Sequence, residues 1–340
     1  MGYQSEAELE NNLINKLGAQ GFKPVKIKDY DTLLLNFRKQ MNRFNRDKLN
    51  GLDMTDVEFE RLMTGLTGKT VFQCAKQLRD QFVLDREDGS TVYLDFFSKY
   101  PERNIWQVTN QVTVVGKYKN RYDVTLLANG IPIVQIELKR AGIDIKEAIN
   151  QIDRYRIHSY KGLFHFVQFY VVSNSVETRY FSNTDDARIM KSLTFYWTDE
   201  KNKRINNLDE FSVDFLSVNR VTKMIYKYMI LTESDKNLII MRPYQIYATE
   251  AVMDRALSTE RGGFVWHTTG SGKTLTSWKC ANLLIQEPRI KKVFFLVDRN
   301  DLDTQTMAEF NRFEPDCVDV TDKTYKLVKQ IENANINWLS

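Results

Sequence analysis

Residues 120–139 read NRYDVTLLANGIPIVQIELK, and the predicted fold of the first part of the chain is built around this stretch. Two apolar runs, residues 124–127 and 131–138, flank the pair Asn129-Gly130. Asn and Gly both tolerate positive φ, so this pair between two β-forming runs predicts a tight β-hairpin. The hairpin is expected to lie in a mostly apolar sheet.

Three charged residues mark the open end of this hairpin. Asp123 is expected to open the first strand, and Glu137 and Lys139 are expected to close the second. Residues two apart in a strand share a face, so Glu137 and Lys139 point the same way, and Asp123 joins them if the register allows. Two carboxylates beside an ammonium group suit Mg²⁺ and phosphate chemistry. The pattern by itself leaves open a solvated sheet edge, where charges are also common.

Composition and charge set limits on the class of protein. The 340 residues suggest about two domains, and 42% hydrophobic with 27% charged residues is ordinary for a globular chain. The net charge of +4 is compatible with nucleic acid but does not establish it. Three scattered Cys and three scattered His argue against a zinc site or disulfides, and indicate a reducing cytoplasm. No signal peptide or membrane-spanning run is present, so no membrane association is expected.

The hairpin is flanked by further predicted elements. Ser5 and Glu8 form a capping-box pattern at the start of a helix, where Glu8 either only caps or also faces the metal site. Gln151 and Tyr155 lie four apart on one helical face, and either hydrogen-bond a carboxylate, base or phosphate or have no role. Helices are expected at 31–50, 145–160 and 213–230, and strands at 92–97, 106–115, 163–172 and 178–181. Positive charge beside the carboxylates comes from Lys117, Lys119, Arg121 and Arg140.

A second motif lies after the predicted change of domain at 232–236. The sequence HTTGSGKT at 267–274 stands between a predicted strand at 262–266 and a helix at 275–285, and a strand is expected at 292–298. Gly-rich backbone at a helix N-terminus binds phosphate, with the lysine reaching the β- and γ-phosphates and the following hydroxyl reaching Mg²⁺. Trp266 and Trp278 are expected to be packing residues. The nucleotide site is therefore assigned to the residues Gly270, Ser271, Gly272, Lys273 and Thr274.

The order of these motifs resembles a known family. Asp123…Glu137-x-Lys139 matches the PD-(D/E)xK nuclease pattern, Gln151-x-x-x-Tyr155 matches its QxxxY element, and TTGSGKT matches superfamily-two motors. Together they resemble the amino-terminal part of the motor/restriction (R) subunit of type I restriction-modification enzymes. The resemblance implies an α/β fold: a restriction-endonuclease-like domain at 1–231, then a partial RecA-like P-loop domain at 232–340.

The resemblance also implies roles and partners. Asp123 and Glu137 would hold catalytic Mg²⁺, Lys139 would complete the nuclease centre, Thr274 would bind the Mg²⁺ of ATP, and Gln245 would recognise adenine. The substrate would be duplex DNA, and methyltransferase and specificity subunits would be partners. No acidic motor motif or second motor lobe follows, so this polypeptide is expected to bind nucleotide weakly without hydrolysing ATP. The alternatives are an ATP-driven helicase or translocase whose front domain only grips DNA, and a nucleotide-gated docking module.

Overall fold

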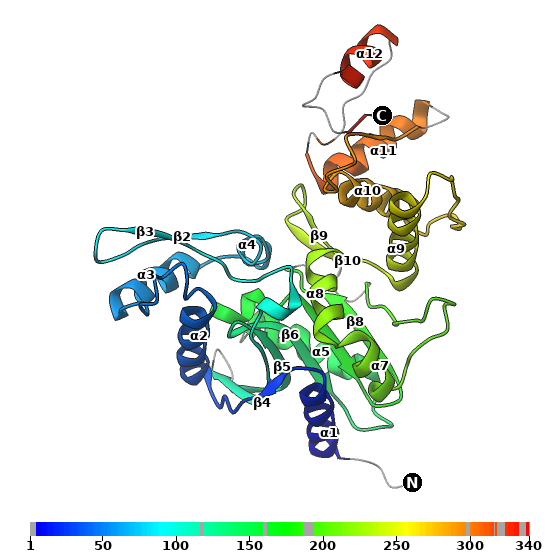
Figure 1. The fold of residues 1–340 in the computed structure, drawn as a ribbon. Coiled ribbons are helices and arrows are strands. Elements are labelled where there is room, and N and C mark those ends of the chain that lie inside the picture. The colour runs from blue at the N-terminus through cyan, green and yellow to red at the C-terminus, as the bar shows by residue number, and fades with distance from the viewer. Residues whose placement is uncertain are drawn as a thin grey trace. The chain divides into compact units, whose positions relative to one another are not determined.

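A six-stranded mixed sheet forms the centre of the first part of the chain (Figure 1). The computed structural model describes residues 5–115, 119–158, 162–185, 193–296, 300–315, 317, 324–332 and 338–339. In spatial order the strands are β1 (Lys23–Pro24), β4 (Trp106–Val115), β5 (Lys119–Ala128), β6 (Ile131–Leu138), β7 (Phe169–Ser173) and β8 (Thr178–Ser182). Strands β4, β5 and β6 run antiparallel, whereas β1 with β4 and β6 with β7 are parallel. The expected mixed α/β architecture of this part is confirmed.

The hairpin β5–β6 lies at the centre of this sheet. All residues of β6 are buried. Asn129 and Gly130 form the turn with φ values of 54° and 81°, as the Asn-Gly pair predicts. A Cβ on Gly130 would lie 2.8 Å from the Phe37 backbone in α2 (Tyr30–Phe44), so glycine is required there for space as well as for its φ. The predicted hairpin is therefore confirmed.

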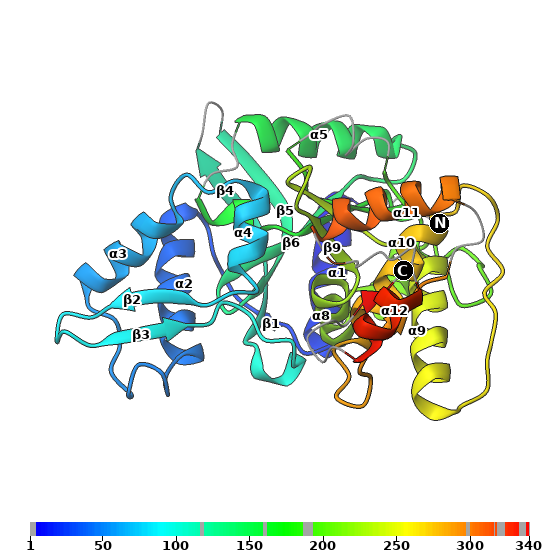
Figure 2. The same ribbon diagram turned by 90° about the horizontal axis from the view of Figure 1, so that it is seen from above.

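Two helices cover opposite faces of the hairpin near its open end. In Figure 2, α5 (Ile145–His158) lies above strands β5 and β6, and α1 (Glu6–Ala19) lies below them. The Tyr122 ring in β5 packs against Tyr155 of α5, with the ring centroids 4.8 Å apart. Neighbouring residues in a strand point to opposite faces, so Asp123 points towards the α1 side.

A smaller group of elements is inserted between β1 and β4. It contains α2, α3 (Asp56–Leu66), α4 (Val71–Gln77), the antiparallel pair β2 (Phe82–Asp85) and β3 (Thr91–Leu94), and the 3₁₀ turn η1 (Pro101–Arg103). The buried Arg86 guanidinium lies 3.1 Å from the buried Glu58 carboxylate, and this ion pair joins α3 to the β2–β3 hairpin. Losing one partner of such a pair leaves a buried charge without compensation, so the pair holds the insertion together.

Several predicted elements of this part have different bounds. The first strand of the hairpin begins at Lys119 rather than at Asp123, and the helix predicted at 31–50 ends at Phe44. The apolar run at 163–172 begins with the 3₁₀ turn η2 (Gly162–Phe166), because a continuous apolar run does not distinguish a strand from a turn. The predicted helix at 213–230 is two helices, α7 (Leu208–Phe215) and α8 (Val218–Tyr226), and Ser217 caps the second.

The chain is divided into two compact units. The first contains residues 1–199, 203–229 and 238–240, and the second contains 200–202, 230–237 and 241–340. The predicted junction at 232–236 is the turn between β9 (Met229–Thr232) and β10 (Asn237–Ile240). The remaining elements are α9 (Pro243–Ser258), α10 (Lys273–Leu284), β11 (Val293–Phe294), α11 (Asn300–Phe313), α12 (Thr324–Glu332) and β12 (Trp338–Leu339).

Two strand predictions in the second unit differ from the structure. Residues 262–266 are not a strand, and Phe264 and Trp266 are 89% and 87% exposed, so Trp266 is not the packing residue that the sequence predicts. An apolar run becomes a strand only when a neighbour pairs with it, and none of the described residues does so here. The strand predicted at 292–298 is reduced to β11, and Asp298 lies outside the described residues, as does Lys117 of the first unit. The described residues thus hold a parallel β11–β12 pair and no RecA-like sheet.

No helix within the described ranges combines the length and the apolar character needed to cross a lipid bilayer.

Candidate active site

A β-bulge in the central hairpin decides which residues meet at its open end. Near the turn Leu127 pairs with Pro132, but beyond the bulge Leu126 pairs with Val134, so Ile133 is an extra residue in β6. The shifted register continues to Val124↔Ile136 and therefore sets Asp123 opposite Glu137. Without the extra residue Asp123 would face Ile136, because a one-residue shift exchanges the faces of a strand.

The two carboxylates share a buried environment. The backbone N–H of Leu138 donates to Asp123 Oδ2 at 2.8 Å. Glu137 has no exposed surface, and its Oε2 atom has no hydrogen-bond partner. Burial raises the pKa of the Asp123 carboxyl. Burial, and then the neighbouring Asp123 charge, raise the pKa of Glu137 well above its usual range. Burial and mutual repulsion both disfavour the state in which Asp123 and Glu137 are ionised at once. A bound cation would stabilise that doubly charged state.

Lys139 supplies one positive charge at this position. Its Nζ atom lies 3.8 Å from Glu137 Oε1, and its side chain is 13% exposed. The same Nζ donates to the Leu138 carbonyl at 3.2 Å, and the Lys139 backbone N–H donates to Ser173 at 2.8 Å in β7. The backbone of Lys139 is fixed by its bond to β7, and its ammonium group therefore stays beside the carboxylates.

Helix α5 brings Gln151 and Tyr155 to the same site. Gln151 Nε2 donates to Glu137 Oε1 and to the Tyr155 hydroxyl. The Tyr155 hydroxyl donates to the Arg121 carbonyl at 3.1 Å. The amide thus engages one oxygen of Glu137 and leaves the other, Oε2, for a further ligand. The five residues predicted for the nuclease centre all lie together.

Glu10 is a further acidic residue at this site that the sequence interpretation missed. Its carboxylate accepts from Asn110 Nδ2 at 3.1 Å and from Gln111 Nε2 at 2.5 Å in β4. Burial raises its pKa, and the Asp123 charge adds to the shift. Glu10 stands three and seven residues before the buried Leu13 and Leu17, so helical periodicity alone would have placed it on the inner face.

Glu8 has the capping role and not a place at the site. The Ser5 backbone N–H donates to Glu8 Oε2 at 2.8 Å, and the Glu8 N–H donates to Ser5 Oγ at 3.3 Å. The predicted capping box at the start of α1 is therefore confirmed.

The residues present fit a divalent cation. Within the described residues no three His, Cys, Asp or Glu side chains converge closely enough to enclose an ion by themselves. Mg²⁺ commonly binds one or two carboxylates and keeps several waters, so Asp123 and the unpartnered Oε2 of Glu137 are a sufficient pair of ligands. The Glu10 carboxylate adds negative charge that acts on both Asp123 and Glu137.

The raised pKa of Glu137 leads to a stability prediction. A carboxyl whose folded pKa exceeds its unfolded value stabilises the fold when protonated, and that stability is lost as pH rises through the folded pKa. Glu137→Gln is therefore expected to raise the Tm of the metal-free chain at pH 8 by about 2–4 °C, with little change at pH 4. Mg²⁺ should then raise the Tm of the wild type but not that of the variant.

Differential scanning calorimetry at the two pH values, with and without Mg²⁺, measures this. Glu147→Gln, an exposed position on α5, is the matched control and should behave as the wild type. If Glu137→Gln lowers the Tm at pH 8, burial does not raise the pKa of the Glu137 carboxyl, and the prediction is wrong.

The second unit contains the predicted phosphate loop. Gly270 and Gly272 adopt φ values of 75° and 77°, and α10 begins at Lys273 directly after them. Lys273 is exposed, and its Nζ atom donates to the carbonyls of His267 and Thr268 at 3.4 and 3.5 Å. The backbone N–H groups at this helix start are suited to an anion. Trp278 packs against Phe313, with ring centroids 5.1 Å apart, so its predicted packing role is confirmed.

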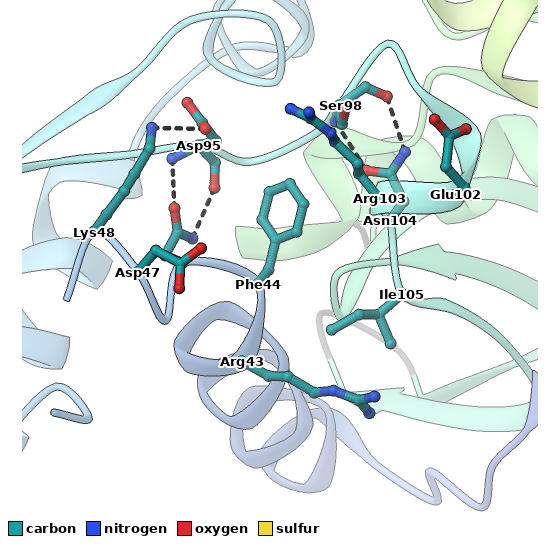
Figure 3. A pocket seen from close by; sticks show the side chains of 11 residues that line it. Arg43, Phe44, Asp47, Lys48, Asp95, Ser98, Glu102, Arg103, Asn104 and Ile105 are labelled. Carbon is teal, nitrogen blue, oxygen red and sulfur yellow. Dashed lines mark hydrogen bonds and ion pairs between the residues drawn. The ribbon is translucent and has the colours of Figure 1, made fainter. Parts of the chain in front are cut away.

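The first unit also has a cavity away from the acidic site. Its volume is about 730 Å³, and its wall includes Ile105 next to the hairpin turn, at the opposite end of the sheet from Asp123. Figure 3 shows the Phe44 ring between the Lys48–Asp95 ion pair and Arg103. Three cations and three carboxylates line the cavity and balance in charge: Arg43, Lys48, Arg103, Asp47, Asp95 and Glu102. Because these charges balance, the cavity does not favour binding of a nucleic-acid phosphate backbone. The cavity is also separate from the candidate active site.

The fold and the site geometry together define the class of this domain. It is a mixed α/β domain whose central hairpin carries two carboxylates and a lysine. Comparison with known proteins agrees with that class. Residues 3–189 match the model of the type I restriction enzyme R protein N terminus, and residues 244–339 match that of the SWI2/SNF2 ATPase. The chain belongs to the type I restriction enzyme R protein family.

Individual relatives support this membership. The chain is 52% identical over 337 residues to the endonuclease subunit of a type I restriction enzyme from Staphylococcus aureus, covering 99% of this chain and 36% of that protein. It is 35% identical over 263 residues to the EcoprrI endonuclease subunit from Escherichia coli, covering 74% of this chain and 82% of that protein. The chain thus spans about a third of the length of the staphylococcal relatives it matches.

Proposed function

We propose that this chain forms the nuclease unit and the start of the motor in the R subunit of an ATP-dependent type I restriction enzyme. Residues 1–231 would be the endonuclease domain and residues 232–340 the beginning of a RecA-like motor domain. The observation that carries the proposal is the bulge-set register, which places Asp123 opposite Glu137 with Lys139 beside them. The relatives named endonuclease subunits support it.

The proposed reaction is hydrolysis of phosphodiesters in duplex DNA. Asp123 and Glu137 would hold Mg²⁺, which when bound polarises a phosphoryl oxygen and lowers the pKa of its water. Lys139, with its ammonium group beside the carboxylates, would stabilise charge that develops on the phosphate. Gln151 would orient Glu137, and Tyr155 would hold Gln151 against the strand.

The motor part would act through ATP. Lys273 would contact the β- and γ-phosphates, Thr274 would bind the accompanying Mg²⁺, and the backbone of 270–272 would hold the β-phosphate. Methyltransferase and specificity subunits of the same complex would recognise the DNA site, in the cytoplasm.

The test is plasmid cleavage by the assembled enzyme with the full-length subunit. Cutting is expected to require both ATP and Mg²⁺, and to fall at least about 100-fold when either is omitted. ATP hydrolysis measured in parallel separates the alternatives. If the enzyme hydrolyses ATP in a DNA-dependent way but the plasmid stays intact, the chain belongs to a translocase with a non-catalytic front domain. If the enzyme neither hydrolyses ATP nor cuts the plasmid, the chain is a docking module.

A further inference from the structure

A residue with a strained backbone lies inside β4, beside the candidate active site. Gln111 has a φ of 56°, whereas the other non-glycine residues with positive φ in the described part of the chain lie in turns or loops. A left-handed φ is uncommon for a residue with a side chain, and it persists only where the surrounding contacts hold it. The pairing of β4 with β5 keeps one register on both sides of Gln111, which therefore lies opposite Asp123.

The left-handed φ allows two consecutive amides to reach one carboxylate. In a regular strand, neighbouring side chains point to opposite faces. In β4, however, Asn110 Nδ2 donates to Glu10 Oε2 at 3.1 Å, and Gln111 Nε2 donates to Glu10 Oε1 at 2.5 Å. The positive φ of Gln111 interrupts the alternation of the strand, and both oxygens of the Glu10 carboxylate are bonded from β4 as a result.

This contact does more than attach α1 to the sheet. The same helix already buries Leu9, Leu13 and Leu17, and burial of apolar side chains is sufficient to dock a helix. Within the described residues, the buried Gln111 Oε1 atom has no hydrogen-bond partner. Backbone strain and an unpaired buried acceptor both reduce stability, so a purely structural contact would not be expected to combine them.

Both donors are neutral, so they fix the Glu10 carboxylate without cancelling its charge. Burial raises the pKa of this carboxyl, whereas the two amide bonds, and more weakly the exposed Arg121, oppose that shift because they stabilise the charged form. The Glu10 charge acts on Asp123 and on Glu137, the two proposed ligands of the cation. A fixed negative charge beside two carboxylates increases the attraction for a divalent cation.

We propose that Asn110 and Gln111 are positioning residues of the nuclease centre, whose amides hold the Glu10 carboxylate as a fixed negative charge that strengthens cation binding at Asp123 and Glu137. The ligand class is a hydrated divalent cation, whose waters offer donors to the unpaired Gln111 Oε1. The inference rests on the proposed cation site and extends it, because neither amide belongs to the nuclease motif that the sequence matches.

Mg²⁺ binding to the 340-residue chain, measured by isothermal titration calorimetry, tests this role without DNA or catalysis. Gln111→Gly removes one amide and accommodates the positive φ, and Asn110→Ala removes the other amide. Each substitution is expected to weaken Mg²⁺ binding about 10-fold. The Tm of Gln111→Gly should change little, because relief of the strain offsets the lost hydrogen bond.

Asn50→Gly is the matched control, because Asn50 is exposed and also has a positive φ, of 52°. It should bind Mg²⁺ as the wild type does. Unchanged Mg²⁺ affinity in both amide variants would overturn the proposal. If the Tm falls as well in those variants, the two amides only attach α1 to the sheet.

A double substitution tests whether Gln111 acts through Glu10. Glu10→Gln is expected to weaken Mg²⁺ binding by a similar factor, and adding Gln111→Gly to it should cause little further loss. A further loss of about 10-fold in the double variant would show that Gln111 acts independently of Glu10, against the proposal.

Asp123→Ala separates this inference from the proposed function. If Asp123→Ala leaves Mg²⁺ affinity unchanged, the proposed cation site is wrong and the inference fails with it. If Asp123→Ala weakens Mg²⁺ binding and the two amide variants do not, the cation site stands and the inference alone is wrong.

Discussion

Replacing Lys139 by alanine is expected to reduce DNA cleavage by the assembled enzyme at least about 100-fold. The Lys139 ammonium group lies 3.8 Å from Glu137 Oε1 and is mostly buried, so its charge acts in a poorly solvated site. Charges fixed in such a site stabilise a transition state more than they would in water, because they need no reorganisation. ATP hydrolysis should be retained, since Lys139 lies in the first unit and the phosphate loop in the second.

The measurement is the rate of plasmid cutting, with ATP hydrolysis and Tm measured on the same preparations. Lys146→Ala, an exposed lysine at the start of α5, is the matched control and should cut as the wild type does. A Lys139→Ala enzyme that cuts at the wild-type rate would remove the nuclease assignment from this hairpin. Parallel loss of ATP hydrolysis would point to failure of assembly instead of loss of the catalytic charge.

The second large effect is expected at the phosphate loop. Lys273→Ala should lower DNA-dependent ATP hydrolysis by the assembled enzyme at least about 100-fold, and ATP-dependent cleavage should fall with it. The reason is chemical: the lysine would reach the β- and γ-phosphates, whose charge grows as the bond breaks. Lys273 is exposed, and its Nζ donates to loop carbonyls at the long distances of 3.4 and 3.5 Å, so the substitution should change Tm little.

A steady-state ATPase assay with and without DNA checks this. Lys291→Ala, an exposed lysine between α10 and β11, is the control of the same residue type in the same unit. Normal ATP hydrolysis by Lys273→Ala would show that the glycine-rich turn is not the nucleotide site. The two substitutions together separate cutting from motor activity, because Lys139→Ala should stop the first alone and Lys273→Ala should stop both.

Local signals in the sequence predicted much of the first unit. The Asn129-Gly130 turn, the capping box at Ser5 and Glu8, and strand β4 appear in the structure as expected. Each depends on residues close together in the chain, where backbone preference and side-chain capping act without help from the rest of the fold. The same holds for the loop at 270–274, whose two glycines adopt positive φ.

Predictions failed where a non-local partner decides the outcome. Residues 262–266 have the composition of a strand, but a strand forms by pairing and no described residue pairs with them. The sequence predicts one strand over 163–172, yet only the end of this run joins β6, because the apolar side chains before it can be buried in a turn equally well.

By itself, the sequence determined that a hairpin with Asp123, Glu137 and Lys139 at its open end exists in this chain. It did not determine that the two carboxylates meet. The extra residue Ile133 moves the register by one, and that shift sets Asp123 opposite Glu137. The approach of Glu10 from α1 was likewise decided by tertiary structure. Strand register and helix docking depend on contacts between segments that lie far apart in the chain. The energies of these contacts cannot be inferred from any short stretch of sequence.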